Sequence, residues 1–161
     1  MAERKPLVIN AGQIQQIQTG DTLDVNLTGE VDTVSLENEN AGTIVIGCPV
    51  YCSDVDKVDK AQANAVATVE VLGLVQDVTI LTTASGNIQT DGVLTATTGQ
   101  WDAITGDTGG LTAGSVYYLD PDTAGMLTTT VPPDAGDFVL RVGKAISATG
   151  LEISILNAVK L

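Results

Sequence analysis

The sequence predicts an all-β protein, a small β-barrel or sandwich with an extended N-terminal arm. Turn signals recur about every eight to twelve residues, a spacing typical of many short strands. The segments between the turns are rich in threonine and valine, which favour strands. No long amphipathic helical pattern competes with them. We therefore divide the 161 residues into an arm, 1–40, and a β-barrel or β-sandwich domain, 41–161.

The arm differs in composition from the rest of the chain. Residues 6–10 indicate a short strand, residues 13–18 are extended or weakly paired, and residues 22–27 alternate between apolar and polar side chains. Residues 31–40 are acidic and rich in amides, with too few apolar side chains for a core of their own. We interpret the whole segment as an arm that pairs with another subunit or with its own domain.

The front half of the domain has a denser apolar pattern. Gly73 interrupts one apolar run, as at a strand bend or bulge. The alanine-rich residues 61–68 are compatible with one or two helical turns. In chain order we expect strands at 43–46, 49–51, 69–75 and 78–81, a charged turn at 54–60 and a further turn at 85–87.

The last third carries the clearest hairpin signals. Asp91-Gly92 is a strong turn signal between residues 88–90 and 93–96. The loop at 120–125 places proline and glycine for a tight reversal. The remaining expected segments are 101–105 after a Thr-Thr-Gly turn, a strand pair at 115–119 and 126–130, and a final pair at 138–146 and 151–156.

The charge distribution excludes several classes of partner. The formal net charge is −13, and residues 61–140 hold nine acids without a single lysine, arginine or histidine. Such a surface repels nucleic acid phosphates and anionic lipid headgroups, so we expect neither as a partner. No apolar run is long enough for a membrane span. The apolar stretch behind the basic start is too short for a signal peptide, so we expect synthesis in a cytoplasm.

Two acidic motifs have both a chemical and a structural interpretation. Asp107-Thr108-Gly109 matches the active-site triplet of aspartic proteases, but its GDTGG context favours a glycine-rich loop. Asp54, Asp56 and Asp59 suggest a cation site, but lysines interrupt them and the central glycine of a calcium loop is missing. We favour a loop and a solvated charged turn, and we expect no metal and no cofactor.

The two cysteines, Cys48 and Cys52, flank Pro49. Four residues of extended strand span about 13 Å, whereas the Cα atoms of a disulfide lie within about 7 Å. Zinc would need two further ligands. We expect two reduced, mostly buried thiols; contact with a symmetry mate across an oligomer axis is the alternative.

The aromatic side chains and the hydroxyl-bearing residues offer no clear catalytic set. Trp101, Tyr117 and Tyr118 could form a platform for carbohydrate, although core and rim positions are more typical. Histidine is absent, which excludes a Ser-His-Asp triad, and there is no phosphate-loop motif. A pair of glycosidase acids remains open, but nothing singles out two of the acids. We expect no enzymatic activity.

Several runs of residues resemble one family. Residues 110–130 (GLTAGSVYYLDPDTAGMLTTT), Pro132-Pro133, residues 138–149 (FVLRVGKAISAT) and the LEISI strand at 151–155 resemble the C-terminal β module of tailed-bacteriophage virion proteins. These include capsid decoration (cement) proteins, head fibres and some tail-associated proteins. The opening KPLVINAGQIQQIQTGDTLDV resembles N-terminal segments of phage fibre and minor structural proteins, and residues 41–75 resemble the front half of the module.

The resemblance implies a trimeric, non-enzymatic virion component. Our hypothesis is a capsid decoration protein that binds the major capsid protein on the outer surface of a phage head and stabilises it, with assembly in the host cytoplasm. The alternative is a head or tail fibre component whose loops contact glycan receptors on the host. The expected oligomer and capsid contacts lie in the arm and are Arg4, Lys5, Leu7, Val8, Ile9, Ile14, Ile17 and Leu23.

Overall fold

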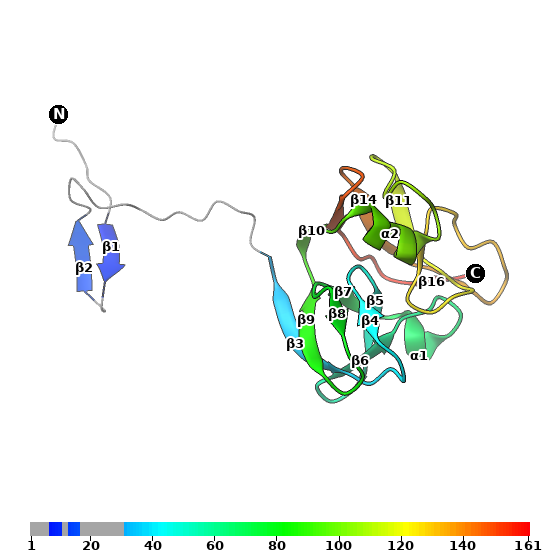
Figure 1. The fold of residues 1–161 in the computed structure, drawn as a ribbon, viewed down its shortest axis with the longest axis horizontal. Coiled ribbons are helices and arrows are strands. Elements are labelled where there is room, and N and C mark those ends of the chain that lie inside the picture. The colour runs from blue at the N-terminus through cyan, green and yellow to red at the C-terminus, as the bar shows by residue number, and fades with distance from the viewer. Residues whose placement is uncertain (1–6, 11–12, 17–30) are drawn as a thin grey trace.

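The computed structural model describes residues 7–10, 13–16 and 31–161. Strands dominate this part of the chain, which confirms the all-β fold class (Figure 1). They form one closed five-stranded barrel, one open five-stranded sheet and three two-stranded pairs. The predicted barrel is therefore present, and a second sheet with the same number of strands accompanies it.

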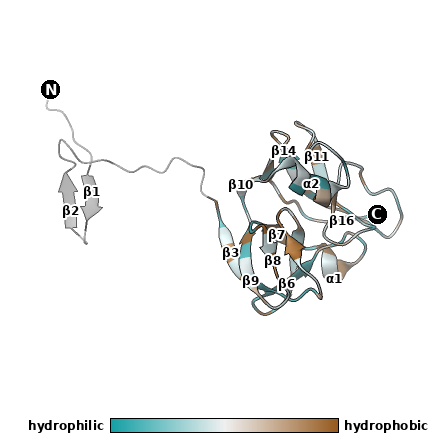
Figure 2. Cartoon of the chain, viewed as in Figure 1, coloured by the Kyte–Doolittle hydropathy of each residue, from teal (hydrophilic) through white to brown (hydrophobic). Residues whose placement is uncertain are grey.

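The barrel has the strand order β3-β6-β5-β7-β9. β3 pairs in parallel with β6 and antiparallel with β9, so it closes the ring between them. Because each strand of the ring has two neighbours, the barrel presents no free edge. Its strands carry many of the hydrophobic residues (Figure 2). Their bounds are β3 (Thr33–Asn38), β5 (Pro49–Asp54), β6 (Lys57–Lys60), β7 (Val71–Val75) and β9 (Ser85–Gln89).

The second sheet is antiparallel throughout and has the order β10-β15-β14-β11-β12. It is open, with β10 and β12 at its two edges. Two of the predicted pairs in the last third are confirmed, since β11 pairs with β12 and β14 pairs with β15. The strands are β10 (Gly92–Thr95), β11 (Val116–Leu119), β12 (Leu127–Thr128), β14 (Arg141–Ala145) and β15 (Gly150–Ile153).

The remaining elements are short. The two-stranded pairs are β1 (Leu7–Asn10) with β2 (Gln13–Gln16), β4 (Ile44–Val45) with β8 (Thr79–Ile80), and β13 (Phe138–Val139) with β16 (Val159–Lys160). A single helical turn, α1 (Val66–Val69), overlaps the alanine-rich segment. The longer helix α2 (Thr98–Thr105) occupies the region of the predicted segment 101–105.

Helix α2 begins and ends with recognisable capping signals. At its start the Thr97 side chain accepts a hydrogen bond from Gln100 N–H, and Gln100 Oε1 in turn accepts one from Thr97 N–H, which together form a capping box. At its end Gly106 adopts a left-handed conformation with φ 72°. The helix buries Trp101 and Ile104. A pattern of Thr followed three residues later by Gln was the sequence signal for this helix.

Trp101 connects the two sheets within one hydrophobic core. The side chain is fully buried, and a Cβ added at Gly47, just before β5, would lie 2.8 Å from its ring. On the other side, Trp101 Nε1 donates a hydrogen bond to the carbonyl of Thr149, just before β15 (3.0 Å). Barrel and open sheet therefore share one hydrophobic core, in which Trp101 lies between segments next to β5 and β15.

The structure corrects the boundary of the arm. Residues 33–38, which lie inside the predicted arm of 1–40, form barrel strand β3. Composition did not reveal this, because β3 has only one fully buried side chain, Asn38. Main-chain pairing with β9 over five residue pairs and with β6 holds the strand in place.

Several predicted turns are also wrong. Of the charged turn predicted at 54–60, residues 57–60 form barrel strand β6. Residues 85–87 begin strand β9, and Asp91-Gly92 does not form a hairpin between its flanking strands. β9 pairs with β3 and β7, whereas β10 pairs with β15. Gly92 does have a positive φ of 79°, as a turn requires. The turn redirects the chain from the barrel into the open sheet.

Candidate functional site

The predicted contact residues fall partly within the described chain. Leu7, Val8 and Ile9 lie in β1, and Ile14 lies in β2. Arg4, Lys5, Ile17 and Leu23 lie outside the described residues. The structure therefore brings four of the eight predicted positions together in one hairpin.

The register of this hairpin gathers apolar positions. Ile9 is paired with Ile14, and Leu7 is paired with Gln16. Directly opposed residues share a face of an antiparallel ribbon, and so do alternate residues along one strand. Leu7, Ile9 and Ile14 thus occupy positions on one face. An isolated two-stranded hairpin is at best marginally stable in water, so these positions favour packing against a further surface.

The edge strand β10 offers main-chain groups for such a contact. Ala96 N–H donates to the Thr149 carbonyl (2.9 Å), which continues the β10–β15 register by one pair. Opposed pairs in an antiparallel ladder alternate between bonded and non-bonded. The N–H and C=O groups of Val93 and Thr95 consequently point away from β15. Within the described chain, no other strand pairs with β10 at this edge.

A mostly apolar groove begins where β10 ends. It consists of two adjoining hollows with volumes of about 570 and 250 Å³, and both are lined by Ile46, Val78 and Gln100. Val78 is 65% exposed, which is high for a valine in the wall of a groove. The other lining residues are Val45, Thr79, Thr95, Ala96, Thr97, Gly99, Ala103 and Thr149. The groove therefore combines the β4–β8 pair and its flanking residues with β10 and helix α2.

The N-terminal segment enters the body of the protein close to this edge. The Asp32 carbonyl accepts a hydrogen bond from Thr90 N–H (2.8 Å) and from the Thr90 hydroxyl (3.2 Å). Thr90 lies two residues before the first residue of β10. The exit of the N-terminal segment and the groove thus adjoin the two ends of the open edge.

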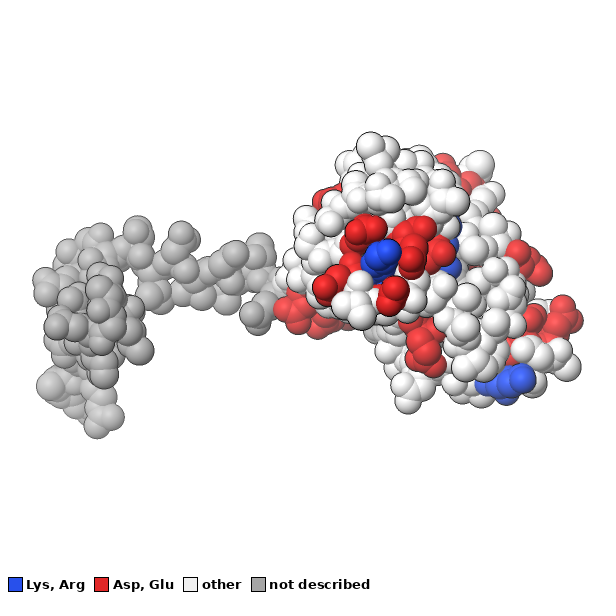
Figure 3. All heavy atoms as spheres, turned by 90° about the horizontal axis from the view of Figure 1, so that it is seen from below, with Lys and Arg blue, Asp and Glu red and all other residues white. Residues whose placement is uncertain are grey.

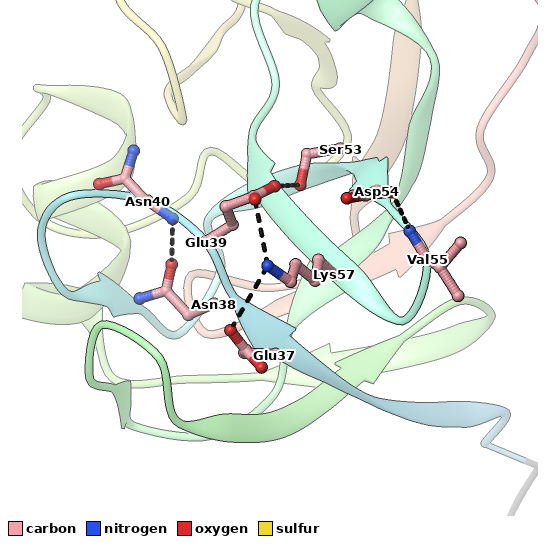
Figure 4. Close-up of polar contacts among 8 residues, drawn as sticks. All are labelled: Glu37, Asn38, Glu39, Asn40, Ser53, Asp54, Val55 and Lys57. Carbon is pink, nitrogen blue, oxygen red and sulfur yellow. Dashed lines mark hydrogen bonds and ion pairs between the residues drawn. The ribbon is translucent and has the colours of Figure 1, made fainter.

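A cluster of charged and polar side chains lies where β3 meets β6 on the barrel. Lys57 Nζ lies 3.3 Å from Glu39 Oε1 and 3.9 Å from Glu37 Oε1, and the Ser53 hydroxyl donates to the other Glu39 oxygen (Figure 4). The hydrogen bond and charge of Glu39, followed by the charge of Glu37, raise the pKa of Lys57. Acidic side chains predominate on this face (Figure 3). We call Glu37, Glu39, Ser53 and Lys57 the Lys57 cluster.

The Lys57 cluster does not resemble a metal site. Among the described residues, no group of three or more acids or cysteines is arranged to hold an ion. Within the cluster, the lysine ammonium occupies the position between the two glutamates that a cation would take. The charge of the same face also affects Tyr51, whose pKa is raised by burial and then by Asp59 and Glu39.

The predicted thiols differ from each other. Cys48 is buried, as expected, but Cys52 is exposed, which corrects the expectation that both would be mostly buried. The two are free cysteines without a disulfide. Burial raises the pKa of Cys48 to about 12, with opposing smaller effects of Lys60 and Asp59. The Cys48 thiol therefore remains protonated and unreactive near neutral pH.

The aromatic side chains do not form a common platform. Trp101 and Tyr117 are buried in the core, and the Tyr117 hydroxyl accepts a hydrogen bond from Thr112 N–H (2.9 Å). Tyr118 is only half-buried. The structural interpretation of these residues as core and rim therefore holds. Asp107 lies in an exposed loop after α2, as predicted for the glycine-rich interpretation of its motif.

Comparisons with known proteins leave the family open. No protein-family model and no curated protein sequence matches the chain. In the part of the chain that the structure describes, neither helix has the length and apolar character needed to cross a membrane.

Proposed function

We propose that this protein is a capsid decoration protein of a tailed bacteriophage, which binds the major capsid protein on the outside of the head as a homotrimer. In this role it stabilises the shell mechanically and performs no catalysis. The sequence resemblance of residues 110–130 and 138–155 to phage virion modules supports the proposal, and these residues supply four of the five strands of the open sheet.

The observation that carries the proposal is the separation of the β1–β2 hairpin from the folded body, residues 31–161. Residues 7–10 and 13–16 form a separate two-stranded sheet, and the core that holds Trp101 lies within residues 31–161. Strand addition by such a segment supplies main-chain hydrogen bonds without special side-chain chemistry. Three modest contacts made by one trimer combine through avidity into tight binding.

The charge of the body suits a protein displayed in many copies. Residues 31–161 hold sixteen acids and five bases, whereas residues 1–16 hold one acid and two bases. Like-charged bodies repel one another in solution and remain soluble at high local density. Residues 1–16 lack this excess of negative charge, so Arg4 and Lys5 are suited to an acidic capsid surface.

Binding to heads tests the proposal directly. Purified protein is mixed with heads of the phage that encodes it, and gold-labelled particles are examined by negative-stain microscopy. We expect label over the whole head lattice. Label restricted to the tail or to sparse projecting fibres would favour the fibre alternative, and an absence of label on the particle would contradict both.

A matched pair of variants tests the role of the hairpin. Ile9→Asp places a charge among the apolar positions of β1, whereas Asn10→Asp places the same charge at the neighbouring position on the other face. We expect Ile9→Asp to lose head binding at least tenfold and Asn10→Asp to retain it. Circular dichroism checks that the body is folded in both variants. Equal binding by the two variants would remove the hairpin from the mechanism.

A further inference from the structure

We infer that the β1–β2 hairpin of a second copy of this chain docks on the open edge of β10 and covers the adjoining groove. The inference rests on the proposed trimer and names the surface through which it would assemble. The acceptor site consists of the outward main-chain groups of Val93 and Thr95 together with the groove wall at Ile46 and Val78.

The lengths of the two partners match. β10 has four residues, and so do β1 and β2. A four-residue strand can pair along the whole open edge of β10, where Val93 and Thr95 each offer one donor and one acceptor. Its alternate apolar residues would then face the groove, as in other cases of strand addition.

The acceptor surface is suited to burial. Val93 is 40% exposed and Val78 is 65% exposed. An open edge next to exposed apolar side chains is a site for pairing with another chain unless something covers it. β10 carries no charged residue in Gly92–Thr95 that would discourage such pairing. A hairpin in this position would satisfy the edge and bury both valines.

The connection to the body allows exchange between copies. Fourteen residues, 17–30, separate β2 from the described body, and fourteen residues can span at most about 50 Å. The body end of this connection is fixed beside β10 by the Asp32–Thr90 hydrogen bond. The proposed docking therefore requires a β10 edge of a neighbouring copy within about 50 Å of this point.

The contact is of the head-to-tail kind, which explains why the assembly would be a closed ring. The surface given by one copy is the hairpin, and the surface used on the next copy is the β10 edge. Heterologous contacts of this kind form rings when the rotation between copies closes. A trimer uses three identical contacts and leaves no β10 edge open.

Substitutions at Thr95 test the acceptor edge. Proline removes the outward N–H of Thr95 without removing a bond to β15, and Leu94 in a strand conformation is compatible with a following proline. Valine at the same position keeps the N–H. By light scattering we expect wild type and Thr95→Val at three times the chain mass, and Thr95→Pro at the mass of one chain. A monomeric wild type, or a trimeric Thr95→Pro with native circular dichroism, would overturn the inference.

Disulfide trapping identifies the occupant independently of stability. In a Cys52→Ser background, a chain with Thr95→Cys is mixed with a differently tagged chain that carries Leu7→Cys, Val8→Cys or Ile9→Cys. We expect at least one of the three mixtures to give a disulfide between the two tags, with the native Cys48 protected by burial. If the mixtures give none, and a disulfide forms only within single chains that carry both substitutions, the hairpin docks on its own body and the inference is wrong.

The outcomes also separate this inference from the proposed function. A trimer that cross-links between chains but never binds heads would preserve the docking site and contradict the decoration role. Head binding by a protein that does not cross-link between chains would contradict the docking site and preserve the decoration role.

Discussion

The closed barrel and the open sheet are built from similar short strands, but they differ in what happens at their edges. Strand β3 closes the barrel, so every strand of the ring is paired on both sides. The open sheet ends at β10, where Val93 and Thr95 direct hydrogen-bonding groups outward. Closure removes the sites at which strands of other chains can add, and an open edge retains them. The open sheet, and not the barrel, therefore carries the edge on which the inferred contact between copies rests.

Replacement of Trp101 is the strongest test of whether the two regions are independent. Truncation of a buried tryptophan to alanine costs about 3–5 kcal/mol. Because Trp101 packs against Gly47 and bonds to Thr149, we expect Trp101→Ala to destabilise barrel and sheet together in one denaturant transition. Two separate transitions would show that the regions fold independently.

Trp101→Phe is the control for the hydrogen bond. It keeps an aromatic ring against Gly47 but removes the indole donor. The Thr149 carbonyl still accepts from Ala96 N–H, so no unsatisfied acceptor remains. We therefore expect a clearly smaller loss of unfolding free energy than for Trp101→Ala.

Two glycines offer the same steric test in the two regions. A Cβ at Gly73 in the barrel would lie 2.4 Å from the Gln89 carbonyl oxygen, and a Cβ at Gly143 in the open sheet would lie 2.4 Å from that of Glu152. Overpacking costs about 1–3 kcal/mol. We expect Gly73→Ala to cost more than Gly143→Ala, because strands of a closed ring cannot shift apart without breaking closure.

The measurement is the unfolding free energy of both variants in urea. Gly99→Ala in helix α2 is the control, since a Cβ there would meet nothing within 4 Å and alanine favours a helix. It should leave stability unchanged or slightly raised. Equal losses for Gly73→Ala and Gly143→Ala would show that closure does not make the barrel the stiffer region.

Local signals in the sequence were sufficient for two of the four strand pairs of the open sheet but not for closure of the barrel. The pairs β11–β12 and β14–β15 are formed by neighbours in the chain, so a loop at 120–125 and a turn near Gly150 predicted them. Barrel closure depends on β3, which pairs with residues about fifty positions further along in β9. A strand with mostly exposed side chains gives no periodic signal for such a distant partner.

Of the proposed contact, the sequence pointed only to the hairpin half, and the role of that half stays a prediction. Apolar residues in β1 and β2 indicated a docking segment, whereas the acceptor edge depends on the fact that β10 pairs with β15 and not with β9. The Asp91-Gly92 signal suggested the opposite partner. The groove brings Ile46, Val78 and Gln100 together from three separate elements, and no short sequence pattern encodes that proximity.

Alkaline pH should lower the unfolding free energy of the protein, because the Cys48 thiol ionises more readily in the unfolded chain than in the fold. Its pKa is about 12 in the folded protein, against 9.0 for a solvent-exposed cysteine thiol, so the unfolded chain loses the proton first. Stability is unaffected by this group below pH 9 and falls as the pH rises from 9 to 12. At pH 10 we expect a loss on the order of 1 kcal/mol from this group.

Urea unfolding between pH 7 and 10 measures this effect. Cys48→Ala should have a lower unfolding free energy at pH 7, owing to the lost packing, but a shallower decline with pH than wild type. Cys52→Ala, which changes an exposed thiol, should follow the wild-type slope. Identical slopes for Cys48→Ala and wild type would contradict the assignment.

The Lys57 cluster should contribute least, even though it lies where β3 and β6 close the barrel. Main-chain hydrogen bonds already join β3 to the β6 segment, from Glu37 N–H to the Asp56 carbonyl and from Glu39 N–H to the Val58 carbonyl, both 2.9 Å. The Lys57 side chain is 34% exposed, and ion pairs this accessible are screened by water and salt.

We expect Lys57→Gln to lower the melting temperature only slightly. Because the pKa of Lys57 is raised, the difference from wild type should be present at neutral pH and vanish as the pH rises above 10.5, and salt should reduce it. A large loss that salt leaves unchanged would mean that side chains, rather than the main-chain ladder, close the barrel.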